Sequence, residues 1–354
     1  MANYSYCDKG VILRVLITGV SGYYGSILTK YLLNQDIECV GIDLVPSDIL
    51  SNEKLIICNL CDSMDLEQKL RGQKFDAIIH LASQIDFAVR NQRNLYDNNV
   101  VGTRNIAKIA LALGIKNFIF TSSNSIFLGV KNKFIRDDDA PSPIDMYGRS
   151  KCDSESILLN YQNKFHVNIL RCPNIIDAGR VGMLSVLFEL VRSNATLWVL
   201  GDGGIRHQCL YAQDLNTAVV KLLSSSKSST YNIGSSNVPS FLEMFQHLIK
   251  LTNSKSKIRS IPATLAIPIL KLCYKFHLSP LGPYQFRMLT QDFEFDLSKI
   301  TAELGWKPTQ NNSQILEIAY RHYCDNIQNI QSKKSANSAP VKMGILGLLK
   351  LFKW

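Results

Sequence analysis

No stretch of this sequence is long and apolar enough to form a membrane-spanning helix, which needs about 20 consecutive apolar residues. The nearest candidate, residues 261–276, is interrupted by two prolines and two lysines. The first ten residues are polar and carry no apolar core, so the sequence predicts no secretory signal. The nine cysteines are an odd number in mostly apolar or helix-like segments, which favours free thiols in a reducing compartment. We therefore expect a cytoplasmic protein.

Metal-ligand spacing is also missing. Cys58 and Cys61 are separated by two residues, but no second cysteine pair or histidine pair accompanies them, so we expect no metal site. Nucleic-acid motifs are absent too, and the basic residues behind the net charge of +10 are scattered along the chain. That charge favours anionic partners in general, such as a phosphorylated substrate or an acidic membrane surface. A solvated basic surface is the simpler interpretation, and we expect no nucleic-acid partner.

Strand-like and helix-like segments alternate through the first half of the chain. Short apolar runs typical of buried parallel strands occur at 11–17, 37–44, 54–58, 77–81, 117–121 and 167–171. Helix-like segments occupy 26–34, 65–71, 95–113 and 150–161. This alternation predicts an α/β fold, a Rossmann-type doubly wound parallel sheet over residues 11–175. Residues 176–325 are expected to form mainly a smaller substrate-binding lobe at the carboxyl edge of the sheet, with some segments returning to the core.

A glycine-rich turn follows the first predicted strand. Gly19 permits a tight turn, Gly22 lets the backbone approach a pyrophosphate, and Gly25 lets the next helix pack on the strand. Asp43 ends the second predicted strand, where a carboxylate accepts hydrogen bonds from the adenosine ribose. No lysine or arginine follows Asp43 before Lys54, so a 2′-phosphate would meet an uncompensated like charge. The sequence therefore predicts NAD rather than NADP.

A second motif carries the chemistry of proton transfer. Tyr147 and Lys151 are four residues apart, so on a helix they share one face. A tyrosine can accept the proton of a carbinol only if its pKa falls well below about 10, and a nearby ammonium favours the phenolate. Ser123, at the end of the preceding strand, can hydrogen-bond the substrate oxygen. We predict Ser123, Tyr147 and Lys151 as catalytic residues, against the alternative of an ordinary helix surface.

Together these motifs give the chain a family resemblance. The motif-bearing segments are Ile17–Gly25, His80–Ala82, Asp97–Thr103, Phe120–Ser123, Tyr147–Lys151, Leu170–Asn174 and Leu304–Pro308. In this order they resemble the extended short-chain dehydrogenase/reductase family, the NAD-dependent epimerase/dehydratase group, over about residues 12–310. In that family the tyrosine is the acid/base, the lysine lowers its pKa and binds the ribose, and the serine orients the substrate.

The resemblance implies further site residues. Cofactor contacts are expected from Gly19, Gly22, Tyr23, Tyr24, Gly25, Asp43, Asn59, Leu60, Leu81, Ala82, Ser83, Asn98, Asn99, Tyr147, Lys151 and Pro173. Substrate contacts are expected from Ser123, Asn124, Asn174 and Arg206. Sugar-nucleotide enzymes of the family usually carry a diphosphate-binding arginine seven residues before the aspartate found here as Asp214. His207 occupies that position and Arg206 precedes it.

Three functions follow as hypotheses. The first is hydride transfer between NAD and a carbinol of a nucleotide sugar, as in an epimerase. In the 4,6-dehydratases of the family an Asp-Glu pair follows the serine, and Asn124-Ser125 in that position here disfavours dehydration. The second is a 3β-hydroxysteroid-type or other lipid alcohol dehydrogenase at a membrane face, because residues 258–278 are apolar and 121–126 resemble the strand of that group. For 258–278 an ordinary core helix containing Leu265, Ile269 and Leu272 is the alternative. The third is a non-catalytic dinucleotide-binding interaction protein. The resemblance also implies a homodimer.

The chain ends in a polar linker, 326–342, and an amphipathic tail, 343–354. In a helical tail the two glycines and two lysines recur every three residues on one side, and large apolar residues cover the rest. Such a segment is typical of an anchor at a membrane surface. Binding to a partner protein or to a second subunit is the competing interpretation.

Overall fold

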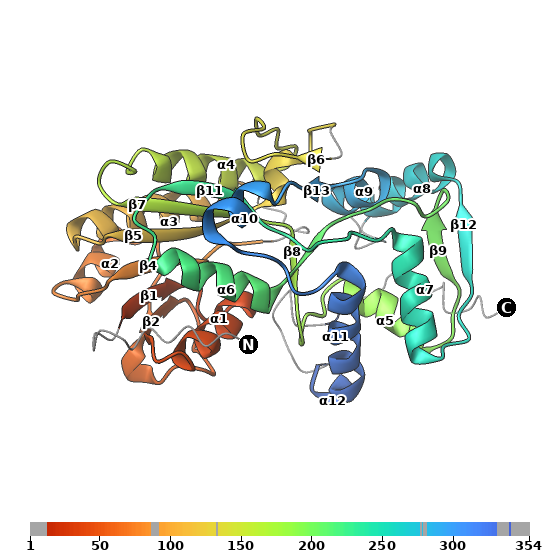
Figure 1. The fold of residues 1–354 in the computed structure, drawn as a ribbon, viewed down its shortest axis with the longest axis horizontal. Helices are drawn as coiled ribbons and strands as arrows, with labels where there is room; N and C mark the ends of the chain where they lie inside the picture. The colour runs from red at the N-terminus through yellow and green to blue at the C-terminus, as the bar shows by residue number, and fades with distance from the viewer. Residues whose placement is uncertain are drawn as a thin grey trace.

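The computed structural model describes residues 13–85, 92–131, 134–276, 278, 282–330 and 340. Its larger lobe is built on a seven-stranded parallel sheet with the order β11-β7-β5-β4-β1-β2-β3 (Figure 1). The strands are β1 (Arg14–Thr18), β2 (Glu38–Asp43), β3 (Leu55–Ile57), β4 (Ala77–His80), β5 (Asn117–Ser123), β7 (His166–Cys172) and β11 (Ser229–Asn232). Most of their side chains are buried, because helices cover both faces.

Two helical layers enclose this sheet. One face carries α1 (Tyr23–Leu33), α6 (Ala212–Leu223) and α10 (Ser298–Leu304), and the other carries α2 (Ser63–Leu70), α3 (Gln92–Ala112) and α4 (Met146–Leu159). Apolar side chains of these helices form two separate cores against the sheet. The structure therefore confirms the predicted Rossmann-type doubly wound fold.

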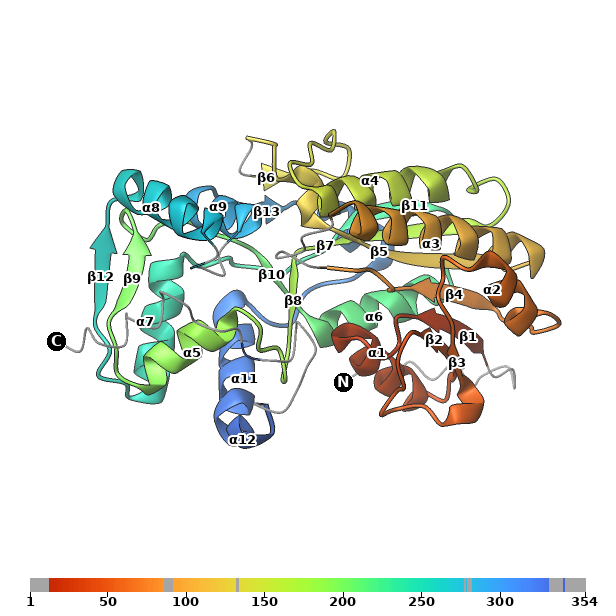
Figure 2. The same ribbon diagram turned by 180° about the vertical axis from the view of Figure 1, so that it is seen from behind.

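A smaller lobe lies beyond the carboxyl ends of the strands (Figure 2). Its strands pair two by two: β8 (Asn174–Ile176) with β10 (Cys209–Tyr211), β9 (Leu197–Leu200) with β12 (Ile258–Ile261), and β6 (Phe134–Ile135) with β13 (Glu294–Phe295). Its helices are α5 (Leu184–Arg192), α7 (Phe241–Thr252), α8 (Ala263–Lys275), α9 (Pro283–Thr290), α11 (Asn312–Asp325) and α12 (Ile327–Ile330). The described residues also form two 3-10 turns, η2 (Asn52–Lys54) and η3 (Asn124–Phe127).

The second half of the chain contributes to both lobes. Strand β11 is part of the large sheet, and helices α6 and α10 pack on it. Helices α5, α7 and α11 instead enclose a core around Phe188 in the small lobe. Trp306, which follows α10, is 1% exposed and donates its indole N–H to the Asp214 carbonyl on α6 at 2.9 Å. This bond fixes the segment after α10 against the large lobe. This exchange of segments fixes the small lobe over the carboxyl edge, where doubly wound sheets bind ligands.

Two expectations about the C-terminal half are corrected by the structure. Residues 327–330 of the expected polar linker form α12, whose Ile330 is buried at 2% exposure. The alternative of a core helix near 258–278 fails, because Leu265, Ile269 and Leu272 on α8 are 50–57% exposed. The predicted amphipathic tail, 343–354, lies outside the described residues. Among the described helices, none is long and apolar enough to cross a bilayer.

Candidate active site

A cleft of about 710 Å³ opens at the carboxyl edge of the large sheet, between the lobes. With one exception, the structure places every predicted site residue on its wall. These residues are Gly19, Gly22, Tyr23, Tyr24, Gly25, Asp43, Asn59, Leu60, Leu81, Ala82, Ser83, Asn98, Asn99, Ser123, Asn124, Tyr147, Lys151, Pro173 and Asn174. The exception is Arg206.

The glycine turn between β1 and α1 has the shape that a pyrophosphate needs. Gly19 has φ +75°, and a Cβ on Gly25 would lie 2.1 Å from the Gly19 carbonyl oxygen, so neither position has room for a side chain. A Cβ on Gly22 would meet only that oxygen, at 3.2 Å, and otherwise point into open space. The backbone at Gly22 is therefore bare toward the cleft, beside the first turn of α1.

Asp43 ends β2 and lines the same cleft. Its carboxylate accepts hydrogen bonds from the Ser21 N–H at 2.9 Å and the Leu44 N–H at 2.7 Å. Of the described residues that line the cleft, only Lys151 and Arg180 carry a cationic side chain. A carboxylate with no cation beside it suits the two hydroxyls of an unphosphorylated ribose and repels a 2′-phosphate. These residues fit NAD.

Helix α4 positions the tyrosine and the lysine. Asp145 caps the helix by accepting the Gly148 N–H at 2.7 Å, so Tyr147 stands in the first turn and Lys151 one turn later. The Lys151 ammonium donates to the Thr121 carbonyl at 2.9 Å and lies 5.9 Å from the centre of the Tyr147 ring. Burial at 3% exposure lowers the Lys151 pKa to about 8. The ammonium form therefore still predominates at pH 7.

The environment of Tyr147 opposes the low pKa that proton transfer from a carbinol requires. Burial raises the pKa of its phenol, and the hydroxyls of Ser83 and Ser123 only partly oppose that rise. The charge of Lys151 does not pull the pKa below 10 in the protein alone, because desolvation of the phenolate prevails. Tyr147 consequently holds its proton until a further positive charge or a substrate oxygen enters the cleft.

The substrate end of the cleft contains a polar cluster that joins three distant segments. Ser123 ends β5, and its hydroxyl accepts the Ser125 N–H at 3.1 Å. The Asn124 side-chain amide N–H donates to the Tyr284 hydroxyl at 3.3 Å, and that hydroxyl donates to the side-chain oxygen Oδ1 of Asn174 at 3.2 Å. Tyr284 comes from α9, 160 residues after Asn124. Sequence reasoning missed it because no local pattern marks a residue brought in by tertiary packing.

Arg180 is the second site residue that sequence reasoning missed. It follows β8 in an irregular segment, lines the cleft, and holds its guanidinium 5.4 Å over the ring of Tyr23. Burial lowers its pKa. Among the described residues, its guanidinium has no hydrogen-bond acceptor and no carboxylate partner. A cation left without an anion in a cleft is ready to bind one.

Arg206, by contrast, is directed away from the cleft. Its guanidinium donates to the Val238 carbonyl at 2.6 Å and pairs with Glu243 at 3.2 Å. The neighbouring His207 is 3% exposed and stacks on Phe293 at 5.4 Å between ring centres. Burial lowers the His207 pKa to about 4, so this ring is neutral at pH 7. The predicted substrate contact of Arg206 is corrected, since neither residue lines the cleft.

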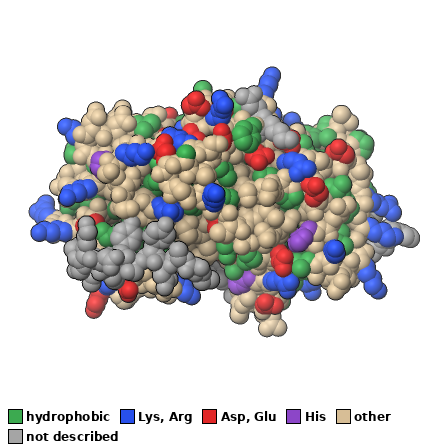
Figure 3. Space-filling view, viewed as in Figure 1, with side chains coloured by type: hydrophobic (Ala, Val, Ile, Leu, Met, Phe, Trp, Pro, Cys, Tyr) green, Lys and Arg blue, Asp and Glu red, His purple; other side chains and the backbone are tan. Residues whose placement is uncertain are grey.

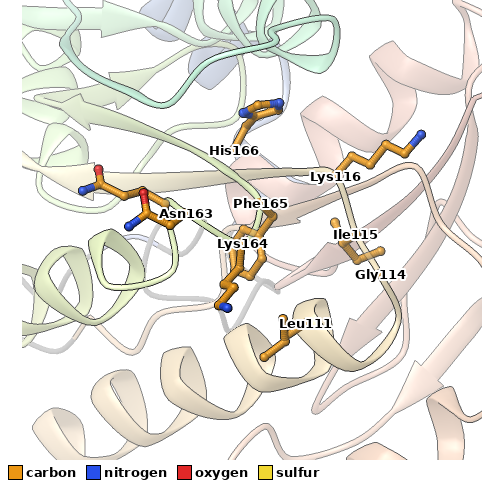
Figure 4. A pocket seen from close by; sticks show the side chains of 9 residues that line it. Leu111, Gly114, Ile115, Lys116, Asn163, Lys164, Phe165 and His166 are labelled. Carbon is orange, nitrogen blue, oxygen red and sulfur yellow. The ribbon is translucent and has the colours of Figure 1, made fainter.

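A second hollow lies at the opposite, amino-terminal edge of the sheet (Figure 4). It measures about 290 Å³ and is lined by Leu111, Gly114, Ile115, Lys116, Gln162, Asn163, Lys164, Phe165 and His166. No nucleophile–base pair lies there among these residues. In the described part of the chain, no cluster of three or more histidine, cysteine or acidic side chains could hold a metal ion.

Comparisons with known proteins agree with this geometry. The model of the NAD dependent epimerase/dehydratase family matches residues 15–234. The uncharacterized protein y4nG of Sinorhizobium fredii is 31% identical over 347 residues, 97% of this chain and 87% of that protein. A 3beta-hydroxysteroid-dehydrogenase/decarboxylase, isoform 1, of Arabidopsis thaliana is 26% identical over 333 residues, 83% and 75% of the two chains.

The fold is also similar to solved structures. UDP-glucose 4-epimerase of Thermotoga maritima, solved with UDP-glucose, superposes with a TM-score of 0.74 at 19% identity. The alignment covers 89% of this chain and 100% of that one. At this identity the likeness concerns the fold.

Proposed function

This chain belongs to the NAD-dependent epimerase/dehydratase family, and from that premise we propose that it transfers a hydride between NAD and a carbinol of a nucleotide sugar. The observation that carries the proposal is the meeting of Ser123, Tyr147 and Lys151 on one wall of the cleft, beside the glycine turn. A dinucleotide and a carbinol therefore have adjoining sites in one cavity.

The chain's own residues provide for the cofactor. The bare backbone at Gly22 and the first turn of α1 suit the pyrophosphate, Asp43 suits the adenosine ribose, and Lys151 suits the nicotinamide ribose. When bound, NAD supplies the acceptor for a hydride and, in reduced form, its donor. This division leaves the proton of the reaction to the protein.

Tyr147 handles that proton. As the hydride leaves the carbinol carbon, the O–H bond breaks and its proton passes to the Tyr147 oxygen, leaving a ketone. Ser123 holds the same oxygen by a hydrogen bond. Because burial disfavours a free phenolate, Tyr147 must first release its own proton to solvent. The Lys151 ammonium, together with the positive charge that oxidised NAD would bring, would stabilise the phenolate that then accepts the carbinol proton.

The outcome depends on what happens to the ketone. If it turns within the cleft and takes the hydride back on its other face, the carbinol is epimerised and no dinucleotide is consumed. Tyr147 then returns the proton it accepted. Asn124 and Asn174, joined through Tyr284, are suited to hold sugar hydroxyls. Asn124-Ser125 after Ser123 gives no carboxylate pair for elimination of water, which favours epimerisation over dehydration.

A nucleotide sugar also carries a diphosphate, which needs a cation. Arg180 is the unpaired cation at the substrate half of the cleft, and we assign it this role in place of Arg206. The Arg180 guanidinium packs over the ring of Tyr23, and the Tyr23 hydroxyl donates to the Asp177 carbonyl at 3.0 Å, which holds that ring in place.

A lipid alcohol dehydrogenase is the second candidate function. Two observations favour it: the Arabidopsis relative is a 3beta-hydroxysteroid-dehydrogenase/decarboxylase, and a buried, neutral His207 occupies the position of the usual diphosphate-binding arginine. The chemistry of Ser123, Tyr147 and Lys151 would be the same. Only the group bound at the outer end of the cleft would differ.

Activity on a substrate panel distinguishes the two. Purified protein is incubated with NAD and either UDP- and dTDP-hexoses or sterol and polyprenol alcohols, and epimer formation and NADH absorbance are followed. We expect epimer formation with a nucleotide sugar and no net NADH. Tyr147→Phe is expected to lower kcat by about a thousandfold or more while NAD affinity is kept. Unchanged turnover in Tyr147→Phe contradicts the mechanism, and NADH release with lipid alcohols alone favours the second candidate.

A further inference from the structure

We propose that the outer face of α8 docks on an anionic lipid surface. Thirteen large hydrophobic side chains in the described part of the chain are more than a third exposed, and five of them fall between positions 265 and 278. These five, each 50–62% exposed, are Leu265, Ile269, Leu272, Phe276 and Leu278. We call them the α8 face. A contiguous exposed apolar patch of this kind marks an interaction surface.

The helix already has its own buried side, so the α8 face is an additional one. Leu265, Ile269, Leu272 and Phe276 are spaced four, three and four residues apart, which aligns them on one side of the helix. The other side carries Ala266 and Cys273, which are 7% and 9% exposed. The rest of the protein covers the buried side of the helix, so only the α8 face is left for an external partner.

Charge identifies the partner. No aspartate or glutamate occurs from 244 to 291, although 29 acidic residues in 354 would give about four in a stretch of that length. The same stretch contains seven lysines and arginines. Lys271 and Lys275 are exposed on the flank of the α8 face, and Arg259 is exposed on the adjoining β12. Figure 3 shows apolar and basic side chains at this end of the molecule, with a few acidic side chains among them.

This combination is the pattern of a helix that lies in a membrane interface. The α8 helix has 13 residues and contains Pro268, and a helix of that length measures only about 20 Å, too short to cross a bilayer. Apolar side chains directed outward can enter the acyl boundary while the flanking lysines reach the headgroups. The absence of aspartate and glutamate from residues 244–291 reduces the repulsion that an anionic bilayer would otherwise exert on this stretch.

The α8 face also has a connection to the cleft. Tyr274 of α8 packs edge-on against Phe286 of α9 at 6.1 Å between ring centres. Two residues before Phe286 on the same helix, Tyr284 lines the substrate end of the cleft. Docking through α8 would therefore hold the substrate end of the enzyme beside the bilayer. The proposal does not depend on which substrate the cleft takes.

Vesicle sedimentation of the full chain tests the proposal. Vesicles of phosphatidylcholine with phosphatidylserine are compared with vesicles of phosphatidylcholine alone. We expect binding to the anionic vesicles that weakens as salt is raised. Leu265→Ser/Ile269→Ser/Leu272→Ser and, separately, Lys271→Glu/Lys275→Glu are expected to weaken that binding by about tenfold or more. The matched controls are Met64→Ser, an 80% exposed position on α2, and Lys108→Glu/Lys116→Glu, and both should bind as the parent does.

Four results would overturn the proposal. The first is a parent protein that does not sediment with anionic vesicles. The second is unchanged binding by both α8 variants together with loss on removal of residues 343–354, which assigns the contact to the tail. The third is equal loss in the matched controls. The fourth is a change of oligomeric state in the α8 variants with vesicle binding retained, which assigns the face to a second copy. Thermal unfolding of each variant establishes that the substitutions leave the fold intact.

Discussion

Tyr147 and Lys151 are both enclosed by protein, and burial has opposite consequences for their protons. It raises the pKa of the phenol and lowers that of the ammonium. Each shift favours the neutral side chain, because a charge in a low-dielectric site loses its hydration. At pH 7 Lys151 is still mainly an ammonium, whereas Tyr147 is poised to become charged only when the cleft fills. A buried acid/base group that responds to its ligand in this way is suited to internal proton transfer.

Arg180 gives a prediction about substrate binding. Arg180→Met removes the unpaired cation of the cleft, and loss of charge-assisted hydrogen bonds to an anion of the substrate is expected to raise KM by about tenfold to a hundredfold. Arg206→Met is the matched control, since that guanidinium is held by Val238 and Glu243 outside the cleft. Steady-state kinetics decide the matter, and an increase in KM in Arg206→Met instead would return the role to that residue.

The positions of Arg206 and His207 explain why the sequence led to Arg206, and not Arg180, as the substrate-binding cation. Arg206 and His207 lie in an extended segment, where successive side chains point to opposite sides. A shift of one position therefore exchanges the outside of the lobe for its interior. The sequence shows that His207 stands where the family usually has a diphosphate-binding arginine. Which residue supplies a cation instead depends on the path of the segment around Gly179, which brings Arg180 to the cleft. No pattern along the chain encodes that path.

In the turn between β1 and α1, Gly25 and Gly22 are glycine for different reasons: Gly25 because the fold leaves no room for a side chain, and Gly22 because a bound pyrophosphate needs the space. A Cβ at Gly25 would lie 2.1 Å from the Gly19 carbonyl oxygen and 2.9 Å from the Val20 Cα. A Cβ at Gly22 would meet a single atom at 3.2 Å. The two glycines have similar places in the motif and different reasons to be glycine.

Substitution of these glycines tests that distinction. Gly25→Ala must displace backbone, so we expect the free energy of unfolding to fall by about 1–3 kcal/mol. Gly22→Ala is expected to unfold near the parent temperature but to bind NAD about tenfold more weakly or worse, because its methyl group enters the space of the pyrophosphate. Thermal unfolding and calorimetric titration with NAD measure the two effects. Equal loss of stability in both variants would contradict the assignment.

Elements with strong local signals could be predicted from the sequence, and those fixed by tertiary contacts could not. The buried strands and their order of appearance were evident because continuous apolar runs bounded by helix-like periodicity are typical of parallel sheets. The orientation of helix α8 was not predictable from its sequence. Its apolar stripe has the spacing of a core helix, and only the structure shows that the stripe faces outward. Tyr284 was likewise unpredictable, because α9 brings it to Asn124 across 160 residues.

For the molecule as a whole, two buried histidines couple stability to pH. His80 is 1% exposed and bonds Thr18 at 2.6 Å and Thr103 at 3.0 Å, and burial lowers its pKa to about 3. His207 has its pKa lowered to about 4 in the same way. Both rings are neutral in the folded protein and become protonated on unfolding below their ordinary pKa of 6.5.

This arrangement predicts acid destabilisation. Because the unfolded chain takes up more protons, the contribution of the two rings is complete above pH 6.5 and is lost as pH falls toward 4. The free energy of unfolding should decrease as pH falls, with a slope for each ring that approaches about 1.4 kcal/mol per pH unit only well below pH 6.5. Denaturant unfolding at pH 7, 6 and 5 measures the slope. His80→Gln and His207→Gln should each reduce it, and a slope unchanged in both variants would contradict the linkage.

The cofactor released by the purified protein is the measurement that tests the proposed function most directly. The protein is purified without added dinucleotide, denatured, and the released NAD, NADH and NADP are quantified against protein. Hydride transfer that is reversed within one turnover requires a retained cofactor, so we predict near-stoichiometric NAD with a fraction of NADH and no NADP. A protein that releases no dinucleotide and exchanges NAD freely at each turnover would contradict the epimerase-like reaction, and bound NADP would contradict the role of Asp43.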